Sequence, residues 1–206
     1  MSQGSSIKVA VVGASGYSGE ELVGRLLHHP CAELTAFTSR QYAGQPLNEI
    51  FPRFTGQGAA DTLKFTEPDP SILAQVAEVI FLALPHGAAA EYAQPLLANN
   101  IRIIDLSADF RLNNGETYEE FYGNKHPAPD LLKEAVYGLP EFYREEIRTA
   151  KLVASPGCYP TSILLPTVPL LKAGLIKATG IIADSLSGVS GAGRNTDPSF
   201  LYSECN

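Results

Sequence analysis

The chain has 206 residues, of which 45% are hydrophobic and 18% are charged, and its formal net charge is −7 at pH 7. This composition is ordinary for a globular protein, and an acidic chain without a cluster of lysine and arginine is not expected to bind nucleic acid. No apolar run is long enough for a membrane span, and residues 1–6 lack the charged and apolar regions of a signal peptide. We therefore expect a cytoplasmic protein with no nucleic-acid or membrane partner.

The three cysteines are Cys31, Cys158 and Cys205. Their odd number and their lack of metal-ligand spacing predict free thiols in a reducing compartment, with neither a disulfide framework nor a metal site.

Strands alternate with helices through the first half of the chain. Strands are expected at residues 7–12, 33–38, 78–84, 101–106 and 151–154, and helices at residues 18–28 and 87–99. Ser18 and Glu21 fit a capping box that opens the first helix. Alternating elements with continuously apolar strands predict an α/β fold, a Rossmann-type parallel sheet with helices on both faces.

The remaining segments are less regular. Residues 42–69 are expected to be a loop with one strand near Leu63, and residues 116–146 short helices that cover a sheet edge. A helix at 162–173 and a strand at 180–187 follow. These elements predict a Rossmann-type domain over residues 1–157 and the start of an α+β catalytic domain over residues 158–206. Since one strand and one helix are too little for an independent core, we expect the C-terminal part to be truncated.

A glycine-rich turn lies between the first strand and the first helix. It reads Gly13-Ala14-Ser15-Gly16-Tyr17-Ser18-Gly19, a Gly-x-x-Gly-x-x-Gly pattern. Such glycines permit a tight turn and let backbone N–H groups approach a pyrophosphate at the helix N-terminus. An ordinary strand-to-helix turn is the alternative, but this position in the chain favours dinucleotide binding.

The second strand ends in Thr38-Ser39-Arg40. An NAD-selective site usually has a carboxylate there, whereas a hydroxyl and a guanidinium suit a 2′-phosphate. Ser39 and Arg40 therefore predict NADP(H) as the cofactor, the alternative being that Arg40 is a solvated surface charge.

Polar residues follow two further strands. His86 comes after the strand at 78–84, where it could line a nicotinamide pocket or cap the next helix. Ser107 and Arg111 follow the strand at 101–106 as a candidate donor and anion clamp, although Arg111 could instead pair with Asp109. His126 is expected to be a surface histidine.

Cys158 lies in Ser155-Pro156-Gly157-Cys158-Tyr159-Pro160-Thr161, between an expected strand and a helix that Pro160 would help to start. A thiol beside a helix N-terminus favours the nucleophilic thiolate, but a buried structural cysteine would fit the local sequence equally well. Further on, the glycine-rich segment 187–194 ends in Arg194, which favours an anion contact over a mere flexible connection.

Four motifs in this order resemble the N-acetyl-gamma-glutamyl-phosphate reductases, a group of semialdehyde dehydrogenases that use NADP in arginine biosynthesis. They are the glycine turn at 13–19, Leu-Ser-Ala-Asp-Phe-Arg at 106–111, Pro-Gly-Cys-Tyr-Pro-Thr at 156–161 and Ser-Gly-Val-Ser-Gly-Ala-Gly-Arg at 187–194. The resemblance covers nearly the whole chain. It implies a Rossmann domain followed by a catalytic domain that also forms a homo-oligomer interface.

The resemblance also implies residue roles. Cys158 would be the nucleophile, forming a thioester with N-acetylglutamyl phosphate that is then reduced to the semialdehyde. Ser107, Arg111 and Arg194 would hold the anionic substrate. The cofactor would be held by Gly13, Ser15, Gly16, Tyr17, Ser18, Gly19, Ser39, Arg40, His86 and Gly191.

Two features depart from that family. Its general-base histidine has no counterpart among the four histidines here, so this chain is expected to lack full activity, and Leu186 stands where many relatives have a polar residue. The related aminoadipyl-phosphate and aspartyl-phosphate reductases, or a non-catalytic NADP-binding module, are the alternatives.

Overall fold

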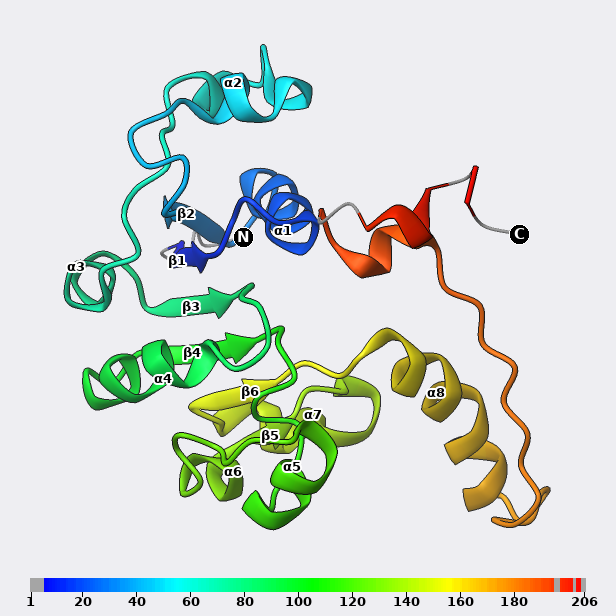
Figure 1. Cartoon of the computed structure of the whole chain (residues 1–206). Helices are drawn as coiled ribbons and strands as arrows, with labels where there is room; N and C mark the ends of the chain where they lie inside the picture. Colours follow the sequence, from blue (N-terminus) through cyan, green and yellow to red (C-terminus); the bar gives the residue numbers. More distant parts are fainter. Residues whose placement is uncertain (1–5, 195–196, 202, 205–206) are drawn as a thin grey trace. The chain divides into compact units, whose positions relative to one another are not determined.

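Residues 1–155 form one structural unit, built around a six-stranded sheet (Figure 1). This computed structural model describes residues 6–194, 197–201 and 203–204. The strands are β1 (Ile7–Val12), β2 (Ala32–Phe37), β3 (Val79–Leu82), β4 (Arg102–Asp105), β5 (Val136–Tyr137) and β6 (Leu152–Ala154). They lie in the order β2-β1-β3-β4-β6-β5, and every neighbouring pair is parallel, which confirms the predicted parallel sheet.

Helices connect these strands. They are α1 (Tyr17–Leu27), α2 (Leu47–Ile50), α3 (Pro70–Val76), α4 (Ala89–Ala98), α5 (Gly115–Tyr122), α6 (Leu131–Glu134) and α7 (Pro140–Thr149), with short 3-10 turns η1 (Pro52–Phe54) and η2 (Gly58–Asp61). Local sequence explains several boundaries. The Asp69 carboxylate accepts hydrogen bonds from the first backbone N–H groups of α3, and Gly123 ends α5 with a φ of 74°.

The core has two layers, one on each face of the sheet. Because side chains alternate along a strand, Val9 and Val11 of β1 pack with α1 and the aromatic residues of segment 47–65, while Ala10 and Val12 pack with α3 and α4. Helices therefore cover both faces, as the sequence predicted. The aromatic layer includes an edge-to-face contact of Phe37 with Phe65, whose ring centroids are 4.8 Å apart.

The strand order fixes where a ligand can bind. The chain passes from β1 to β2 on one side, then returns to β3 on the other side of β1. In open parallel sheets, ligands bind outside the carboxyl ends of the strands where the order reverses in this way. The candidate site is therefore expected beyond Val12 of β1 and Leu82 of β3.

Two local predictions for this unit were wrong, and two short elements were not predicted. Residues 42–69 contain α2, η1 and η2, and near Leu63 there is only an isolated bridge between Pro46 and Lys64. The capping box is absent, because the N-cap of α1 is Gly16 and Ser18 is already inside the helix. The helix α3 and the two-residue strand β5 were not predicted, because both are too short to give a periodic signal.

Residues 156–206 form a second unit. It contains α8 (Cys158–Lys172), η3 (Val189–Ala192) and η4 (Pro198–Phe200). The strand expected at 180–187 is not formed, since these residues have no ladder partner in the described part of the chain. An extended segment becomes a strand only when a neighbour accepts and donates its backbone hydrogen bonds.

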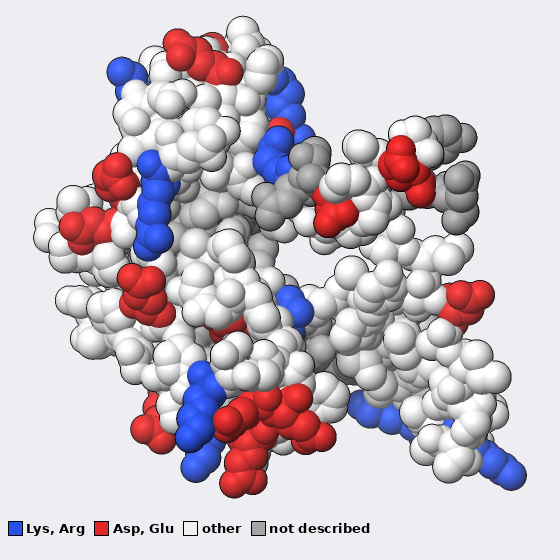
Figure 2. All heavy atoms as spheres, in the orientation of Figure 1, with Lys and Arg blue, Asp and Glu red and all other residues white. Residues whose placement is uncertain are grey.

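The charged side chains are mixed on the visible surface. On the face in Figure 2, lysine and arginine are scattered among aspartate and glutamate and do not gather into one basic area. None of the described helices has the length and apolarity needed to cross a bilayer.

Candidate functional site

The glycine turn after β1 has two positions that admit only glycine. Gly13 has a φ of +82°, and a Cβ there would lie 2.4 Å from the Ala83 carbonyl oxygen. A Cβ on Gly19 would lie 2.6 Å from the Ala14 Cα. These two glycines allow the turn to pack against β3 and α1 to pack against the turn.

Gly16 has a different role. It is the N-cap of α1, and no side chain caps this end of the helix. A Cβ on Gly16 would have only the Gly13 carbonyl oxygen within 4 Å, at 3.9 Å, so glycine is not required there by crowding. The backbone N–H groups of Tyr17, Ser18 and Gly19 open the helix, where the helix dipole favours an anion.

The end of β2 is joined to this turn by hydrogen bonds. The Ala14 N–H donates to the Thr38 carbonyl oxygen at 2.9 Å, and the Gly13 N–H donates to Thr38 Oγ1 at 3.4 Å. The Ser39 hydroxyl donates to Ser15 Oγ at 3.1 Å. Thr38 is fully buried and was not predicted as a site residue; its place directly after β2 is the signal that could have identified it.

A cavity of about 320 Å³ lies at this switch point. Four predicted residues line it, and so do the residues after β3 and one edge of α4. The full lining is Val12, Gly13, Ser15, Thr38, Ser39, Arg40, Gln41, Pro68, Leu84, Pro85, Ala88, Glu91 and Tyr92.

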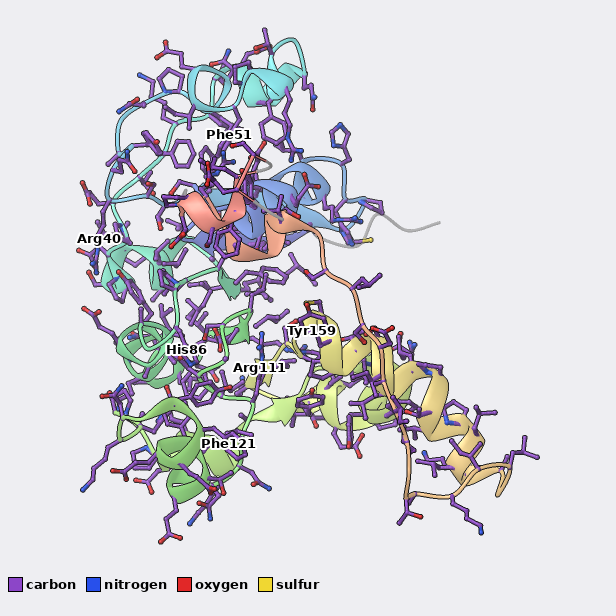
Figure 3. The ribbon with its side chains drawn as sticks, turned by 45° about the vertical axis from the view of Figure 1, so that its right-hand side comes forward. Arg40, Phe51, His86, Arg111, Phe121 and Tyr159 are labelled. Atoms are coloured by element: carbon purple, nitrogen blue, oxygen red, sulfur yellow. The ribbon has the colours of Figure 1, made fainter. Side chains whose placement is uncertain are left out.

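Arg40, labelled in Figure 3, is one of the residues that line this cavity. Its Nη2 donates to the Tyr92 hydroxyl at 2.9 Å and lies 3.9 Å from the Glu91 carboxylate. The hydrogen bond to Tyr92 is the main cause that raises the Arg40 pKa above its ordinary value. Arg40 therefore has a fixed partner. Tyr92 and Glu91 are lining residues that were not predicted from the sequence, because they lie on α4, about 50 positions from Arg40.

His86 is not among the lining residues of this cavity. Its Nδ1 lies 3.2 Å from the Asp109 carboxylate, and its ring packs edge-on against Tyr122 at 4.3 Å between centroids. His86 does not cap α4, which was one alternative. That role belongs to Asp109, which accepts from the Gly87 N–H at 2.7 Å and the Ala89 N–H at 2.8 Å.

The residues after β4 form a buried polar chain. The Ser107 hydroxyl donates to Asp105 Oδ2 at 2.7 Å and accepts from the Asp109 N–H at 3.1 Å. Asp105 is fully buried, and this burial raises its pKa to about 6. The Ser107 hydroxyl, predicted as a substrate donor, thus has its proton directed to Asp105.

Arg111 also bonds within the protein. Its Nε donates to the Ser155 carbonyl at 2.7 Å and its Nη2 to the Leu106 carbonyl at 3.0 Å. No Arg111–Asp109 ion pair is found among the described residues, so the alternative of a structural pair is not supported. A guanidinium has five N–H donors, so other donors of Arg111 are not used by these two bonds.

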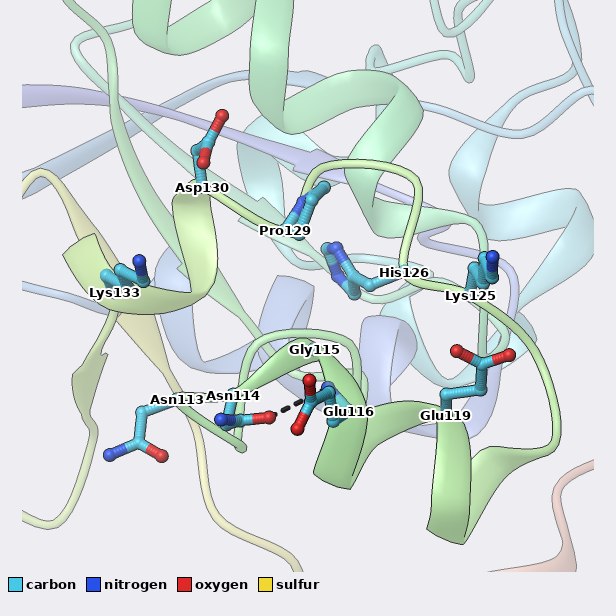
Figure 4. A pocket seen from close by; sticks show the side chains of 10 residues that line it. All are labelled: Asn113, Asn114, Gly115, Glu116, Glu119, Lys125, His126, Pro129, Asp130 and Lys133. Carbon is cyan, nitrogen blue, oxygen red and sulfur yellow. Dashed lines mark hydrogen bonds between the residues drawn. The ribbon is translucent and has the colours of Figure 1, made fainter.

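A second hollow, of about 420 Å³, lies beside α5 and α6 (Figure 4). None of the predicted cofactor or substrate residues lines it. His126 does, but it is only 6% exposed, so its assignment to the surface was wrong. Its ring packs against Phe110 and Tyr118, and burial lowers its pKa.

Three predicted residues belong to the second unit. Cys158 is the first residue of α8 and is exposed, and the Thr161 side chain closes that first turn by donating to the Gly157 carbonyl at 2.9 Å. Gly191 lies in η3, where a Cβ would be 2.9 Å from Ser187 Oγ, and Arg194 follows it in an exposed segment. Cys31 is a free, exposed thiol, and Cys205 is outside the described residues.

Each of the two units matches a known protein family. Residues 8–150 match the family described as semialdehyde dehydrogenase, NAD binding domain. The chain belongs to the semialdehyde dehydrogenase family. Residues 158–206 match the description semialdehyde dehydrogenase, dimerisation domain.

The chain is also similar to curated proteins. It is 59% identical to N-acetyl-gamma-glutamyl-phosphate reductase of Akkermansia muciniphila and 50% identical to that of Rhodopirellula baltica, over 97% and 98% of this chain. In both cases it spans 58% of the relative's length.

A solved structure of aspartate semialdehyde dehydrogenase II from Vibrio cholerae has a TM-score of 0.58 at 19% identity. The likeness covers 82% of this chain and 47% of that one. At this identity it shows the fold, which agrees with the semialdehyde dehydrogenase assignment.

Proposed function

We propose that the protein is an NADPH-dependent reductase that converts N-acetyl-L-glutamyl 5-phosphate to N-acetyl-L-glutamate 5-semialdehyde in arginine biosynthesis. The observation that carries the proposal is the 59% identity, over 97% of the chain, to a protein named N-acetyl-gamma-glutamyl-phosphate reductase. The four motifs that suggested this activity lie on the two units that match the semialdehyde dehydrogenase domains.

The residues at the switch point fit a dinucleotide. Gly13 and Gly19 leave no room for side chains, the N-terminus of α1 has no side-chain cap, and the cavity beside them is lined by Ser15, Ser39 and Arg40. The turn would hold the pyrophosphate and Arg40 the 2′-phosphate, which supports NADP(H) over NAD(H). When bound, NADPH supplies the hydride for the reduction. Gly16, Tyr17 and Ser18 would contribute through their backbone, and His86 and Gly191 remain proposed cofactor contacts.

The chain's own nucleophile would be Cys158. Its thiolate would attack the acyl carbonyl carbon, the bond from that carbon to the phosphate oxygen would break, and phosphate would leave. The thioester so formed on Cys158 gives the semialdehyde when its carbonyl carbon is reduced and the carbon–sulfur bond breaks, which regenerates the thiolate. Exposure of Cys158 at the first position of α8 supports access by a substrate.

Ser107, Arg111 and Arg194 are proposed to hold the anionic groups of the substrate. Arg111 supports this role through the donors that the Ser155 and Leu106 carbonyls do not use. Ser107 would need to redirect its hydroxyl proton from Asp105. We further propose a cytoplasmic homo-oligomer, which the match to a dimerisation domain and the free, exposed thiols of Cys31 and Cys158 support.

The test is phosphate-dependent reduction of NADP by the semialdehyde, followed at 340 nm, with mass detection of a substrate adduct on Cys158. We expect an adduct that is lost in Cys158→Ser and kept in the control Cys31→Ser. Turnover with the aminoadipyl or aspartyl semialdehyde in place of the glutamyl one would redirect the proposal to a sister reductase. Cofactor binding with no adduct on Cys158 from any of the three acyl phosphates would favour a non-catalytic NADP-binding module.

A further inference from the structure

Arg40 lies between two neighbouring hollows of different character. On one side lies the cavity of about 320 Å³ with Gly13, Ser15 and Ser39. On the other side lies a second hollow of about 430 Å³, whose lining includes Glu67 and Asp69, which the first cavity lacks. Arg40, Pro68, Glu91 and Tyr92 line both hollows.

The acidic hollow attracts the Arg40 guanidinium. Both Glu91 and Glu67 favour its charged form electrostatically, and the Glu91 carboxylate is already 3.9 Å from Nη2. Arg40 itself is exposed, with 70% of its side chain accessible, so packing does not hold it. An exposed, flexible arginine among carboxylates would spend time paired with each of them.

Tyr92 is the fixed group at this point. It is only 4% exposed and packs into the core cluster on the α3–α4 face, so its ring cannot follow a moving partner. Its hydroxyl accepts from Arg40 Nη2 at 2.9 Å. The guanidinium is therefore attached to a rigid point on the wall that the two hollows share.

We propose that Tyr92 is a positioning residue for cofactor selection, which holds Arg40 at the phosphate-accepting cavity against the pull of the acidic hollow. The inference rests on the proposed binding of NADP at this cavity. Removing the hydroxyl lets Arg40 turn toward Glu67, which lines only the acidic hollow, so the 2′-phosphate loses a preorganised partner. NAD has no 2′-phosphate, and its affinity does not depend on this contact.

The experiment measures dissociation constants of NADP⁺ and NAD⁺ by calorimetry for the wild-type chain, Tyr92→Phe, Arg40→Ala and the double variant. Phenylalanine keeps the buried ring, and thermal unfolding checks that the fold is kept. Since one hydrogen bond is lost, Tyr92→Phe is expected to weaken NADP⁺ binding about threefold to tenfold and leave NAD⁺ unchanged. In the Arg40→Ala background, removing the Tyr92 hydroxyl should have no further effect, because the two residues act through one contact.

Tyr143→Phe is the matched control, because it removes a tyrosine hydroxyl from α7 and should change neither constant. Equal weakening of both cofactors by Tyr92→Phe would mean a general structural role and overturn the inference. The inference would also be overturned if Tyr92→Phe bound NADP⁺ as tightly as the wild-type chain while Arg40→Ala bound it more weakly. If the wild-type chain bound neither dinucleotide, the proposed function itself would fail, and the inference with it.

Discussion

Residues 1–155 bury their apolar side chains in two clusters, one on each face of the sheet, whereas α8 in the second unit has no buried residue. The sequence of α8 is nonetheless rich in leucine and proline, with Lys172 at its end. A helix that is apolar on all sides is typical of a buried position, which agrees with the match of this unit to a dimerisation domain. Apolar sequence alone therefore does not create burial; a covering surface is also needed.

The candidate chemistry is divided in the same way. The residues proposed for the 2′-phosphate and pyrophosphate lie on the packed first unit, and Cys158 lies on the exposed second unit. We therefore expect a variant at Arg40 to change cofactor binding without changing the reactivity of Cys158, and a variant at Cys158 to change the chemistry without changing cofactor binding.

The largest effect is expected at Cys158. Cys158→Ser should lower turnover by more than about a thousandfold, since it removes the proposed nucleophile, while the dissociation constant of NADP⁺ stays unchanged. Steady-state kinetics and calorimetry measure the two quantities. A variant that lost cofactor binding together with turnover would contradict the division between the units.

The next effect concerns the glycine turn of the first unit. Gly13→Ala should lower the free energy of unfolding by about 2–4 kcal/mol, because it combines a left-handed φ with a clash against the Ala83 carbonyl. Gly44→Ala is the matched control, since Gly44 has a φ of +84° but no atom within 4 Å of the added Cβ. It should cost only about 1 kcal/mol in urea denaturation. Equal losses in the two variants would show that the close approach to β3 contributes nothing.

Asp105 gives the first unit a distinctive pH dependence. Its pKa in the folded state is raised to about 6 from a usual 3.8, mainly by burial. The folded state therefore holds this proton more tightly than the unfolded state, and stability is lost as the pH rises from about 4 through about 6. Relative to Asp105→Asn, the wild type should lose on the order of 1–3 kcal/mol of unfolding free energy across this window. Parallel stability curves for the two proteins between pH 4 and pH 7 would rule out this contribution.

The smallest of these effects concerns Arg40. Arg40→Ala should weaken NADP⁺ binding about tenfold and leave NAD⁺ binding unchanged, because only NADP⁺ carries the 2′-phosphate. The rate of Cys158 alkylation by iodoacetamide should also stay the same. If the preference between NADP⁺ and NAD⁺ did not change, Arg40 would be a solvated surface charge without a role in cofactor selection.

The sequence predicted the parallel sheet and its glycine turn because these depend on local patterns. The β-branched run at 7–12 predicts a strand, and the glycines at 13 and 19 that follow it predict a tight strand-to-helix turn. The partners of the site residues could not be predicted in this way. Tyr92 meets Arg40 from 52 positions away, and Asp109 caps a helix 20 residues before it, so both contacts follow from the strand order rather than from spacing.

The errors have the same origin. Ser18 and Glu21 fit a capping box in sequence, but the helix begins one residue earlier, at Tyr17, and Arg53 from a distant segment takes the Glu21 carboxylate. Residues 180–187 have strand-like composition but no partner in the described chain. In both cases the local pattern was present but the contacts it implies were not formed.

The carboxylate of Asp109 also has a kinetic consequence. It lies after β4, yet it accepts the N–H groups of Gly87 and Ala89 after β3, so two loops that are separate in sequence share one anchor. Such loops should open and close as a single cooperative segment. In hydrogen exchange, the Gly87 and Ala89 amides should therefore exchange at the rate of the segment after β4, and Asp109→Asn should accelerate both together.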